Sequence, residues 1–300
     1  MAGKTIKLFL TDGKPDGLKI AELQQWTGIA LTCPRSEIEK LTRREEASKP
    51  GVYILTSQDE QSQFFAAYIG EAENISSHLK EHNRTLDFWD NICFFTQKDD
   101  NLTKGHIRYL EARMIQVARK AKRMPLKNSS NPTPENIPLP ESDVADMEYF
   151  LGQMQMILPV LGIDLLKPQP QVSNTEAAAN TEESPLFEFK SSDAVATAKT
   201  VNGEFVVLEG SMARKEEVPS FKTHCPSSFK KRRELLETGV LTDYNAKQYR
   251  FNEDYAFRSP SGAADVLAGR SVNGRKEWKV KNTGQTYADW DEQRIAKAAT

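Results

Sequence analysis

A polar stretch past the middle of the chain limits what this sequence can fold into. Residues 167–185 are rich in Pro, Asn, Glu and Ala and carry almost no large apolar side chain, so they cannot contribute to a packed core. The chain has 300 residues, whereas a usual single domain has roughly 100–200. We therefore predict two cores joined by a flexible linker at 167–185.

The segment before this linker has the pattern of an α+β domain. A helix is expected to begin after Asn74, and a longer one should cover 104–123 because Pro125 stops it. Apolar residues at helical spacing between 144 and 161 predict a further helix that packs on the same core. Short β-branched and aromatic runs predict the strands of a small antiparallel sheet: 51–57, 64–70 and 88–97.

The two ends of the chain predict additional modules. Residues 1–45 contain two strand-like runs with a helix-like run, 18–26, between them. After the linker, the pair Asn202-Gly203 predicts a β-hairpin, and 227–239 has the pattern of a basic amphipathic helix. The expected segments are an N-terminal strand and helix extension, an α+β domain with a closing helix, a flexible linker and a C-terminal α+β module: 1–45, 46–166, 167–185 and 186–300.

Composition excludes several classes of protein. No apolar run approaches the ~20 residues that span a bilayer, and the N-terminus lacks the apolar run of a signal peptide, so we expect a cytoplasmic protein. Cys33, Cys93 and Cys225 are widely spaced and form no C-x-x-C pair, which indicates neither a disulfide framework nor a thiolate zinc site.

One carboxylate is out of place on the expected helix 104–123. Glu111 falls among apolar residues on the face that should be buried, and an unpaired buried charge costs several kcal/mol. Glu111 therefore needs a partner, either a neighbouring arginine or a divalent metal ion held by oxygen atoms, which points to Mg²⁺ or Mn²⁺. The other charges of this segment are basic: Lys104, Arg108, Arg113, Arg119, Lys120, Lys122 and Arg123.

Two histidines and two tyrosines are the other candidates for chemistry. His78 and His82 are four residues apart and share one helix face. Three interpretations are open for this pair. The histidines could ligate zinc, although no third ligand is evident, they could be ordinary surface or cleft histidines, or they could belong to a hydrolytic site. Tyr53 and Tyr68 lie in neighbouring expected strands, where tyrosine is also common as a half-buried core residue.

Together these features resemble the GIY-YIG nuclease family over about residues 46–166. Gly51-Val52-Tyr53 and Tyr68-Ile69-Gly70 match its two motifs, followed in order by a helix, a strand, a helix with its glutamate and a loop with an asparagine. The resemblance implies that Tyr53 activates water and that Tyr68 positions water or phosphate. It also implies that Glu111 holds one Mg²⁺ or Mn²⁺ ion, that His82 is catalytic, and that Asn128 or Asn131 orders the site.

The chain departs from the family at one position. His78 stands where family members usually place an arginine that contacts the scissile phosphate. Histidine is only partly charged near neutral pH and offers no bidentate fork, so it should hold the phosphate less firmly. Arg84 or Arg108 are the candidates to replace that contact. The resemblance therefore implies a metal-dependent DNA endonuclease, with a weakened or inactive DNA-binding or regulatory module as the alternative, and a protein scaffold as a third.

The C-terminal module also resembles a known family. The residues Ser259-Pro260-Ser261, Asn273-Gly274 and Trp278 match a short domain of unknown function that often follows bacterial GIY-YIG domains. We expect Ser259 to cap a helix and Asn273-Gly274 to turn into a strand. Basic side chains of this module are expected to contact a DNA backbone, unless they only form a solvated face: Lys230, Lys231, Arg232 and Arg233.

Overall fold

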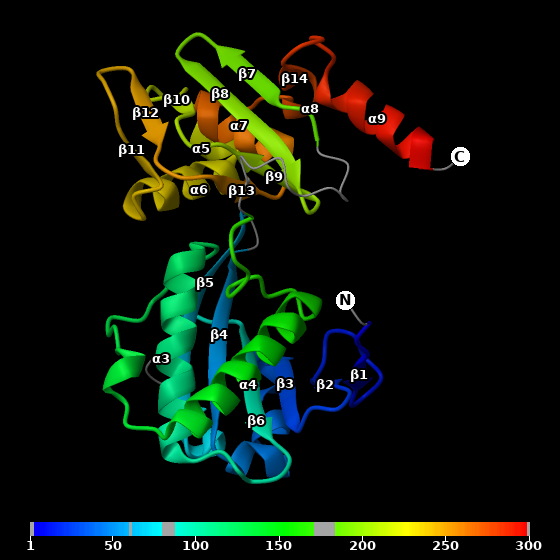
Figure 1. The fold of residues 1–300 in the computed structure, drawn as a ribbon, viewed down its shortest axis with the longest axis vertical. Coiled ribbons are helices and arrows are strands. Elements are labelled where there is room, and N and C mark those ends of the chain that lie inside the picture. The colour runs from blue at the N-terminus through cyan, green and yellow to red at the C-terminus, as the bar shows by residue number, and fades with distance from the viewer. Residues whose placement is uncertain (1–2, 60–61, 80–87, 171–183, 299–300) are drawn as a thin grey trace. The chain divides into compact units, whose positions relative to one another are not determined.

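The computed structural model describes residues 3–59, 62–79, 88–170 and 184–298. The chain divides into two compact units. Residues 1–59 and 65–168 form the first, and most of the second is residues 169–300 (Figure 1). Each unit combines an antiparallel sheet with helices, so the predicted α+β class is confirmed.

The first unit is built on one six-stranded sheet with the strand order β1-β2-β3-β6-β4-β5. The pairings from β1 through β4 are antiparallel. The predicted strands at 51–57, 64–70 and 88–97 correspond to β4, β5 and β6. In order across the sheet, the strands are β1 Ile6–Leu10, β2 Lys19–Leu23, β3 Gly28–Pro34, β6 Asn91–Gln97, β4 Gly51–Asp59 and β5 Ser62–Ala72.

The N-terminal segment extends this sheet. Strands β1, β2 and β3 all come from residues 1–45 and continue the sheet through β3, which pairs with β6. The expectation of a helix at 18–26 was wrong, because Lys19–Leu23 is strand β2, which lies between two antiparallel neighbours. Pairing on both sides satisfies its backbone groups and outweighs the helical spacing of its apolar residues.

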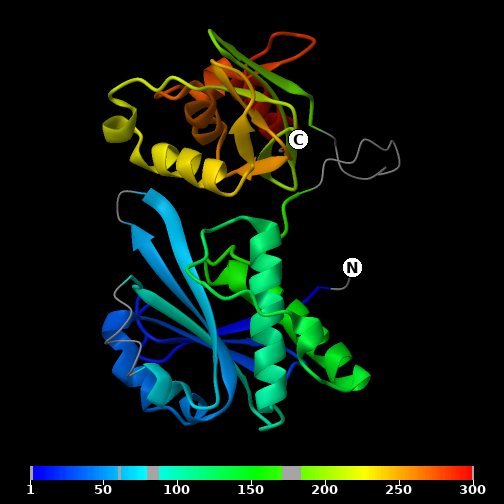
Figure 2. The ribbon, with the colours of Figure 1, turned by 90° about the vertical axis from the view of Figure 1, so that its left-hand side faces the viewer.

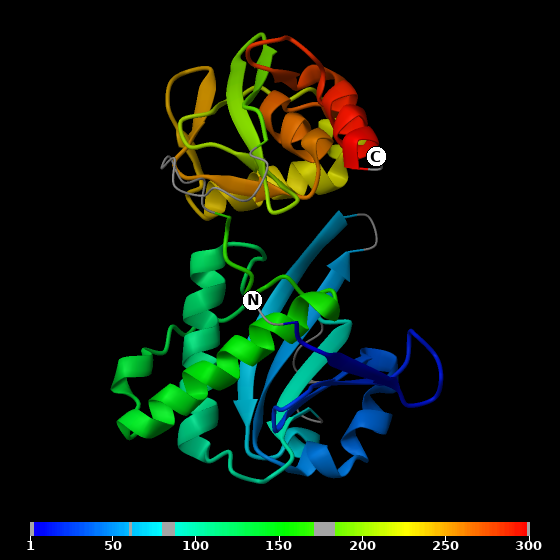
Figure 3. The ribbon, with the colours of Figure 1, turned by 45° about the vertical axis from the view of Figure 1, so that its right-hand side comes forward.

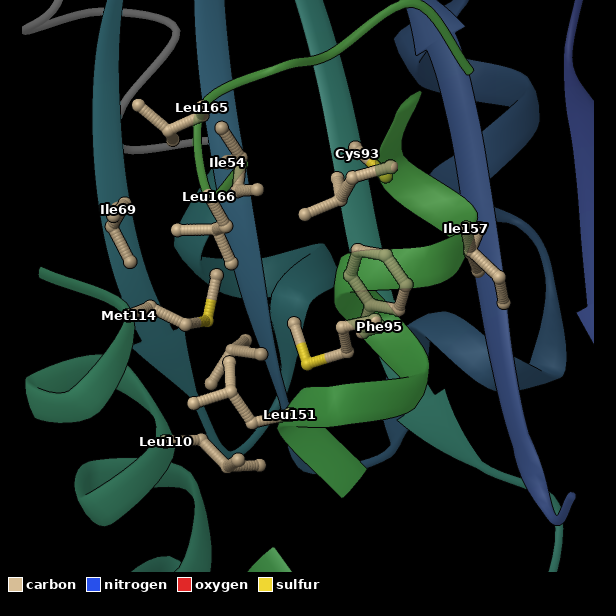
Figure 4. Packing of buried hydrophobic residues seen from close by; sticks show 14 of the residues in the cluster. Ile54, Ile69, Cys93, Phe95, Leu110, Met114, Leu151, Ile157, Leu165 and Leu166 are labelled. Atoms are coloured by element: carbon tan, nitrogen blue, oxygen red, sulfur yellow. The ribbon is translucent and has the colours of Figure 1, made fainter. Parts of the chain in front are cut away.

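Two long helices cover one face of the sheet (Figures 2 and 3). They are α3, Lys104–Ala121, and α4, Glu141–Val160, close to the helices predicted at 104–123 and 144–161. Their apolar side chains meet those of the sheet in one cluster. Figure 4 shows Ile54, Ile69 and Phe95 from the strands facing Met114 of α3 and Leu151 of α4.

The opposite face carries shorter elements. They are the helix α1, Ile38–Thr42, the helical turns at 75–79, and the 3-10 turns Arg35–Glu37 and Glu45–Ser48. Asn74 precedes the turns at 75–79 as predicted, and its Oδ1 accepts from the Ser77 amide at 3.1 Å. A second cluster, including Leu41, Ile75 and Tyr53, packs on this face. A third 3-10 turn, Pro134–Asn136, precedes α4.

The second unit is built on a second sheet. The strand order is β11-β12-β10-β8-β7-β14, with β9 paired to β8 and β13 paired to β9. The predicted hairpin is confirmed, because Asn202 and Gly203 join β8 to β9 with φ angles of 51° and 80°. The strands are β7 Phe187–Ser191, β8 Ala194–Val201, β9 Glu204–Val207, β10 Met212–Arg214, β11 Leu241–Asp243, β12 Gln248–Phe251, β13 Tyr255–Phe257 and β14 Lys279–Val280.

Helices complete the second unit, and α7 bears out the predicted cap. The Ser259 side chain accepts from the Gly262 amide and Pro260 occupies the first turn. Asn273-Gly274 does not turn directly into a strand, because it begins the short helix α8. A Cβ on Gly274 would lie 2.3 Å from the Pro260 oxygen, so this close approach requires glycine. The helices are α5 Phe221–His224, α6 Pro226–Glu237, α7 Pro260–Ala268, α8 Gly274–Glu277 and α9 Tyr287–Ala298.

The described helices include none that is both long and apolar enough to cross a membrane. All three cysteines are free thiols; Cys33 and Cys93 are buried and Cys225 is half-buried.

Candidate functional site

The tyrosine of the first motif is enclosed by the sheet. Tyr53 lies on β4 and is 0% exposed. A Cβ on Gly70, in the neighbouring strand β5, would lie 2.3 Å from the Tyr53 hydroxyl oxygen, and one on Gly51 would lie 2.2 Å from the Phe95 carbonyl oxygen. Both motif glycines are therefore needed sterically, the one at 51 for strand pairing and the one at 70 for the phenol of Tyr53.

Tyr68 and His78 lie beside this phenol. The ring centroid of Tyr68 lies 6.2 Å from that of Tyr53. The ring centroid of His78 lies 5.9 Å from that of Tyr53. Tyr68 and His78 are half-buried. The structure thus brings together three of the residues that the sequence selected. His82 and Arg84, also selected, lie outside the described residues.

Burial and negative charge hold both phenols in their neutral forms. Burial is the main cause that raises the pKa of Tyr53, followed by the proximity of Tyr68 and Glu111 and by a hydrogen bond with Tyr68. Burial and Glu111 also raise the pKa of Tyr68, whereas the same hydrogen bond lowers it. The two phenols are therefore electrostatically coupled to each other and to Glu111.

Glu111 is supplied by α3. Thr103 caps this helix, with His106 closing a capping box, and the buried Ile107, Leu110 and Met114 fix the helix face against the sheet. Glu111 is half-buried among them. Loss of hydration is the main cause that raises its pKa to about 7, repulsion from Glu71 adds to the rise, and Arg108 opposes it.

The described part of the chain gives the Glu111 carboxylate no hydrogen bond and no ion pair. Arg108, one turn earlier on α3, is exposed and acts on Glu111 only through its charge. The sequence left two partners open for Glu111, a neighbouring arginine or a divalent metal ion. Among the described residues, no arginine forms a salt bridge with Glu111.

Glu71 was missed in the sequence, although strand alternation could have found it. Side chains alternate between the two faces of a strand, so Glu71 shares the face of Ile69, which packs in the cluster with α3 and α4. That is the face from which Glu111 approaches. Glu71 is half-buried, and no described residue forms a hydrogen bond or ion pair with it.

Asn128 acts on the strand that carries Tyr68. Its Oδ1 accepts from the Ile69 amide at 3.0 Å, and its Nδ2 donates to the Ile69 carbonyl at 2.7 Å. The Lys127 amide donates to the Ala67 carbonyl at 2.8 Å, and the Ala67 amide donates to the Pro125 carbonyl at 2.9 Å. The segment after α3 thus pairs with the outer edge of β5, and Asn128 continues that pairing with its side chain.

The four basic residues predicted to contact DNA in the second unit separate into two pairs. Lys230 and Arg233 are exposed on α6, so DNA contact stays a prediction for them. Lys231 and Arg232 are 5% and 0% exposed, and their charged groups point into the unit. These two side chains present no surface to a nucleic acid.

The Arg232 guanidinium makes its contacts inside the second unit. It donates to the carbonyl oxygens of Val266, Arg214 and Lys215, and its Nε lies 2.9 Å from a Glu217 carboxylate oxygen. Burial lowers the pKa of Arg232, and Glu217 opposes that shift. Lys231 is likewise paired, at 2.6 Å, with Glu234. Both cations therefore serve the packing of α6.

Among the described residues, no group of three or more His, Cys, Asp or Glu side chains could hold a metal ion. The candidates for a metal-binding role are the carboxylates of Glu111 and Glu71. Glu71 raises the pKa of Glu111, and the charges of both carboxylates raise the pKa of Tyr68.

Comparison with curated proteins found no match, and comparison with solved structures found none either. One family model matches, and it covers the second unit from β7 to the middle of α9. This confirms the resemblance of the C-terminal segment to a family without an assigned function: residues 187–291 match the domain of unknown function DUF4357.

Proposed function

We propose that the first unit is a metal-dependent DNA endonuclease domain of the GIY-YIG type, which hydrolyses phosphodiester bonds. The observation that carries the proposal is Glu111, a half-buried carboxylate whose charge acts on Tyr53 and Tyr68 and for which the described residues provide no hydrogen bond or ion pair. The chain's motifs of Gly51 to Tyr53 and Tyr68 to Gly70 supply the resemblance on which the family assignment rests.

A divalent cation is the partner that fits Glu111 best. A buried carboxylate is costly unless a positive charge or hydrogen bonds compensate it, and the neighbouring Glu71 increases that cost. The two carboxylates are hard oxygen ligands of the kind that Mg²⁺ and Mn²⁺ prefer, and water completes such sites. When bound, the ion would stabilise charge on phosphoryl oxygens.

Cationic side chains of the first unit would hold the DNA phosphate. Arg108 is exposed one turn before Glu111, and no described residue forms a hydrogen bond or ion pair with its guanidinium. It can therefore take the bidentate contact that an arginine makes with phosphate. The His78 imidazole is a second donor, next to Tyr53. The exposed Lys230 and Arg233 are proposed as backbone contacts of the second unit.

A DNA-binding or regulatory module without cleavage is the second candidate. It is favoured by His78, which stands in the place of the usual arginine, and by the burial that keeps Tyr53 neutral. Loss of one preorganised donor costs about 100- to 1000-fold in rate in well-studied sites. A site built in this way would bind DNA and cut it slowly.

The test is a cleavage assay with purified full-length protein on supercoiled plasmid and on branched DNA, with Mg²⁺, Mn²⁺ or chelator. We expect metal-dependent cutting that Glu111→Ala abolishes and that Glu135→Ala, a change at an exposed glutamate, leaves intact. An inert parent that His78→Arg activates supports the second candidate. Cutting that survives loss of Glu111 contradicts the proposed site.

A further inference from the structure

We propose that the sheet of the second unit binds the phosphate backbone of nucleic acid on the face turned away from its helices, without reading the base sequence. The inference goes beyond the proposed nuclease, because it gives a binding surface to the domain of unknown function and needs no cleavage. It places the principal nucleic-acid contacts of this unit on the sheet and not on α6.

The two faces of this sheet have different surroundings. On β8, Ala196 and Ala198 are buried in one cluster with Val266 of α7 and Leu235 of α6, and Figure 1 shows α7 behind β8. Side chains alternate between the faces of a strand, so Val195 points to the opposite side, where it is 51% exposed. We call this second side the open face.

The strand register aligns one row of side chains across the open face. Arg250 of β12 pairs with Met212 of β10. Met212 pairs with Val195 of β8, which in turn pairs with Lys190 of β7. Residues opposite each other on paired strands share a face. The row therefore has a cation at each end, and its three strand-to-strand steps of about 4.8 Å separate these cations by roughly 14 Å.

Positive charge is concentrated on the open face. The whole chain is nearly balanced, with 40 Lys and Arg against 42 Asp and Glu. Two carboxylates lie on the open face, Glu188 and Glu204, the latter opposite Val201. Its cations each adjoin a buried core residue in the chain and therefore point away from the core: Lys190, Lys199, Arg214, Arg250, Lys279 and Lys281.

Some of this charge is compensated within the unit. Glu188 lies 2.8 Å from the Lys190 amine and 3.7 Å from that of Lys281. Arg214 pairs with the exposed Glu216 and lies 4.0 Å from Asp193. These contacts leave fewer free cations than the composition of the face suggests.

The remaining cations have no such compensation. No described residue forms a hydrogen bond or ion pair with the side chain of Lys199, Arg250 or Lys279. Arg250 and Lys279 are exposed, and Lys199 is half-buried. The open face therefore keeps a net positive charge that an anionic partner can neutralise.

The arrangement fits a polyanion better than a small anion. A single phosphate needs donors that converge on one point, whereas these cations lie on separate strands. Their spread of roughly 14 Å corresponds to about four base-pair steps of 3.4 Å, so they can contact separate phosphates of one backbone.

Recognition of bases has little support on this face. Aromatic side chains stack on unpaired bases in many single-strand binding proteins, but the aromatic residues of the described strands β7 to β14 belong to the core cluster or pack against it. The Gln248 amide is engaged by Asp193 and Asn245. We therefore assign contacts to the backbone, which are strong at low salt and independent of sequence.

The test measures binding of the full-length protein to a fluorescent DNA duplex by anisotropy, in chelator and across about 0.05–0.2 M salt. Arg250→Ala/Lys279→Ala removes two exposed cations of the open face. We expect the binding constant to fall at least about tenfold at the lowest salt, and its logarithmic salt dependence to weaken by about 2.

The matched control removes the same charge from the helices. Lys222→Ala/Lys276→Ala changes two exposed lysines on α5 and α8 and should leave the salt dependence as in the parent. All variants should keep the melting temperature of the parent, because the substituted side chains are exposed. Equal losses in both double variants, or no loss in Arg250→Ala/Lys279→Ala, overturn the proposal.

A second pair of variants tests the middle of the row without removing a cation. Val195→Glu places a negative charge between Lys190 and Arg250, and Val195→Lys places a positive one there. We expect the DNA-binding constant to fall about threefold or more in the first and to rise in the second, with a salt dependence steeper by about 1. The same change in both variants, or none, contradicts a contact at this face.

Anionic vesicles of phosphatidylserine and phosphatidylcholine provide the alternative polyanion. Vesicle binding that Arg250→Ala/Lys279→Ala abolishes, with DNA binding unchanged, would assign the face to a lipid surface and overturn the nucleic-acid proposal. Because the assay contains chelator, its result is separate from that of the nuclease proposal. A protein that cuts no DNA but binds it through the open face fails only the nuclease proposal.

Discussion

The helices α3 and α6 are both rich in lysine and arginine, yet they treat buried charge in opposite ways. On α6 the buried groups are cations, and each meets an acidic partner: Arg232 pairs with Glu217 and Lys231 with Glu234. On α3 the half-buried group is an anion, Glu111, for which the described residues provide neither a hydrogen bond nor an ion pair. Burial of charge alone therefore does not mark a candidate site, and the lack of a described partner is what sets Glu111 apart.

The same first unit shows that α3 can satisfy a carboxylate when the function is structural. Glu148 of α4 accepts from Arg113 at 2.8 Å and from Tyr109 at 2.9 Å, and Arg113 is the main cause that lowers the pKa of Glu148. Glu111 lies on the same helix as Arg113 but receives no such contact in the described chain. The contrast supports a ligand, not packing, as the partner of Glu111.

The largest effect is expected when compensation on α6 is broken. Arg232→Met removes the guanidinium, leaves the carbonyls of Val266 and Arg214 without their donor, and leaves Glu217 with the exposed Arg233 as its cation. Removing one partner of a buried pair costs about 3–5 kcal/mol. We expect this loss in the free energy of unfolding of the second unit, measured by urea unfolding. Arg233→Ala, 46% exposed and also paired with Glu217, should cost less than about 1 kcal/mol.

A loss below about 1 kcal/mol in Arg232→Met would show that the second unit relaxes around the missing cation. In that case burial on α6 would not mark a structural role, and the comparison between the two helices would no longer distinguish structure from site.

Much of the secondary structure follows from local signals in the sequence. The hairpin at Asn202-Gly203 and the helix after Ser259 depend on residues that adopt particular backbone angles or cap a helix, and such signals do not need a tertiary context. Strand β2 lacked a signal of this kind. Its apolar spacing suits a helix, and only pairing with β1 and β3 makes Lys19–Leu23 a strand.

The charged residues were harder to place, although one periodicity was available. Lys231 and Arg232 precede Leu235 and Leu236 by four residues, so they share the buried face of α6. Reading the basic run as a surface patch ignored that spacing. Glu71 follows the same rule for strands, two residues after the buried Ile69. The distances between Tyr53, Tyr68 and His78 depend on tertiary packing, which spacing along the chain does not fix.

A smaller effect is expected from Glu111→Gln in the presence of chelator. The pKa of Glu111 is raised to about 7 in the folded protein and is near 4.3 when unfolded, so the folded state loses stability as pH rises between these values. The glutamine variant escapes this loss. Because Glu111 is partly exposed, we expect a gain of about 1–2 kcal/mol at pH 8 and none at pH 4, measured by urea unfolding.

Glu148→Gln is the matched control with the opposite sign. The pKa of Glu148 is lowered by Arg113, so its contribution to stability is present above the unfolded pKa and is lost as pH falls through the folded one. This variant should be destabilised at pH 8, by less than about 1 kcal/mol, and should approach the parent in acid. A Glu111→Gln variant that is less stable than the parent at pH 8 would show that the carboxylate is compensated after all.

The smallest effect on stability, and the sharpest on binding, is expected at Arg108. Its side chain is exposed and has no described ion pair, so Arg108→Ala should change unfolding by less than about 0.5 kcal/mol. If its guanidinium contacts a DNA phosphate, the logarithm of the DNA-binding constant should fall less steeply with the logarithm of the salt concentration in this variant. The magnitude of that slope should decrease by about 1. Lys120→Ala removes an exposed cation from another face of α3 and should leave the slope unchanged. Equal slopes for both variants would mean that α3 attracts DNA only through its total charge, and Arg108 would then have no assigned phosphate beside Glu111.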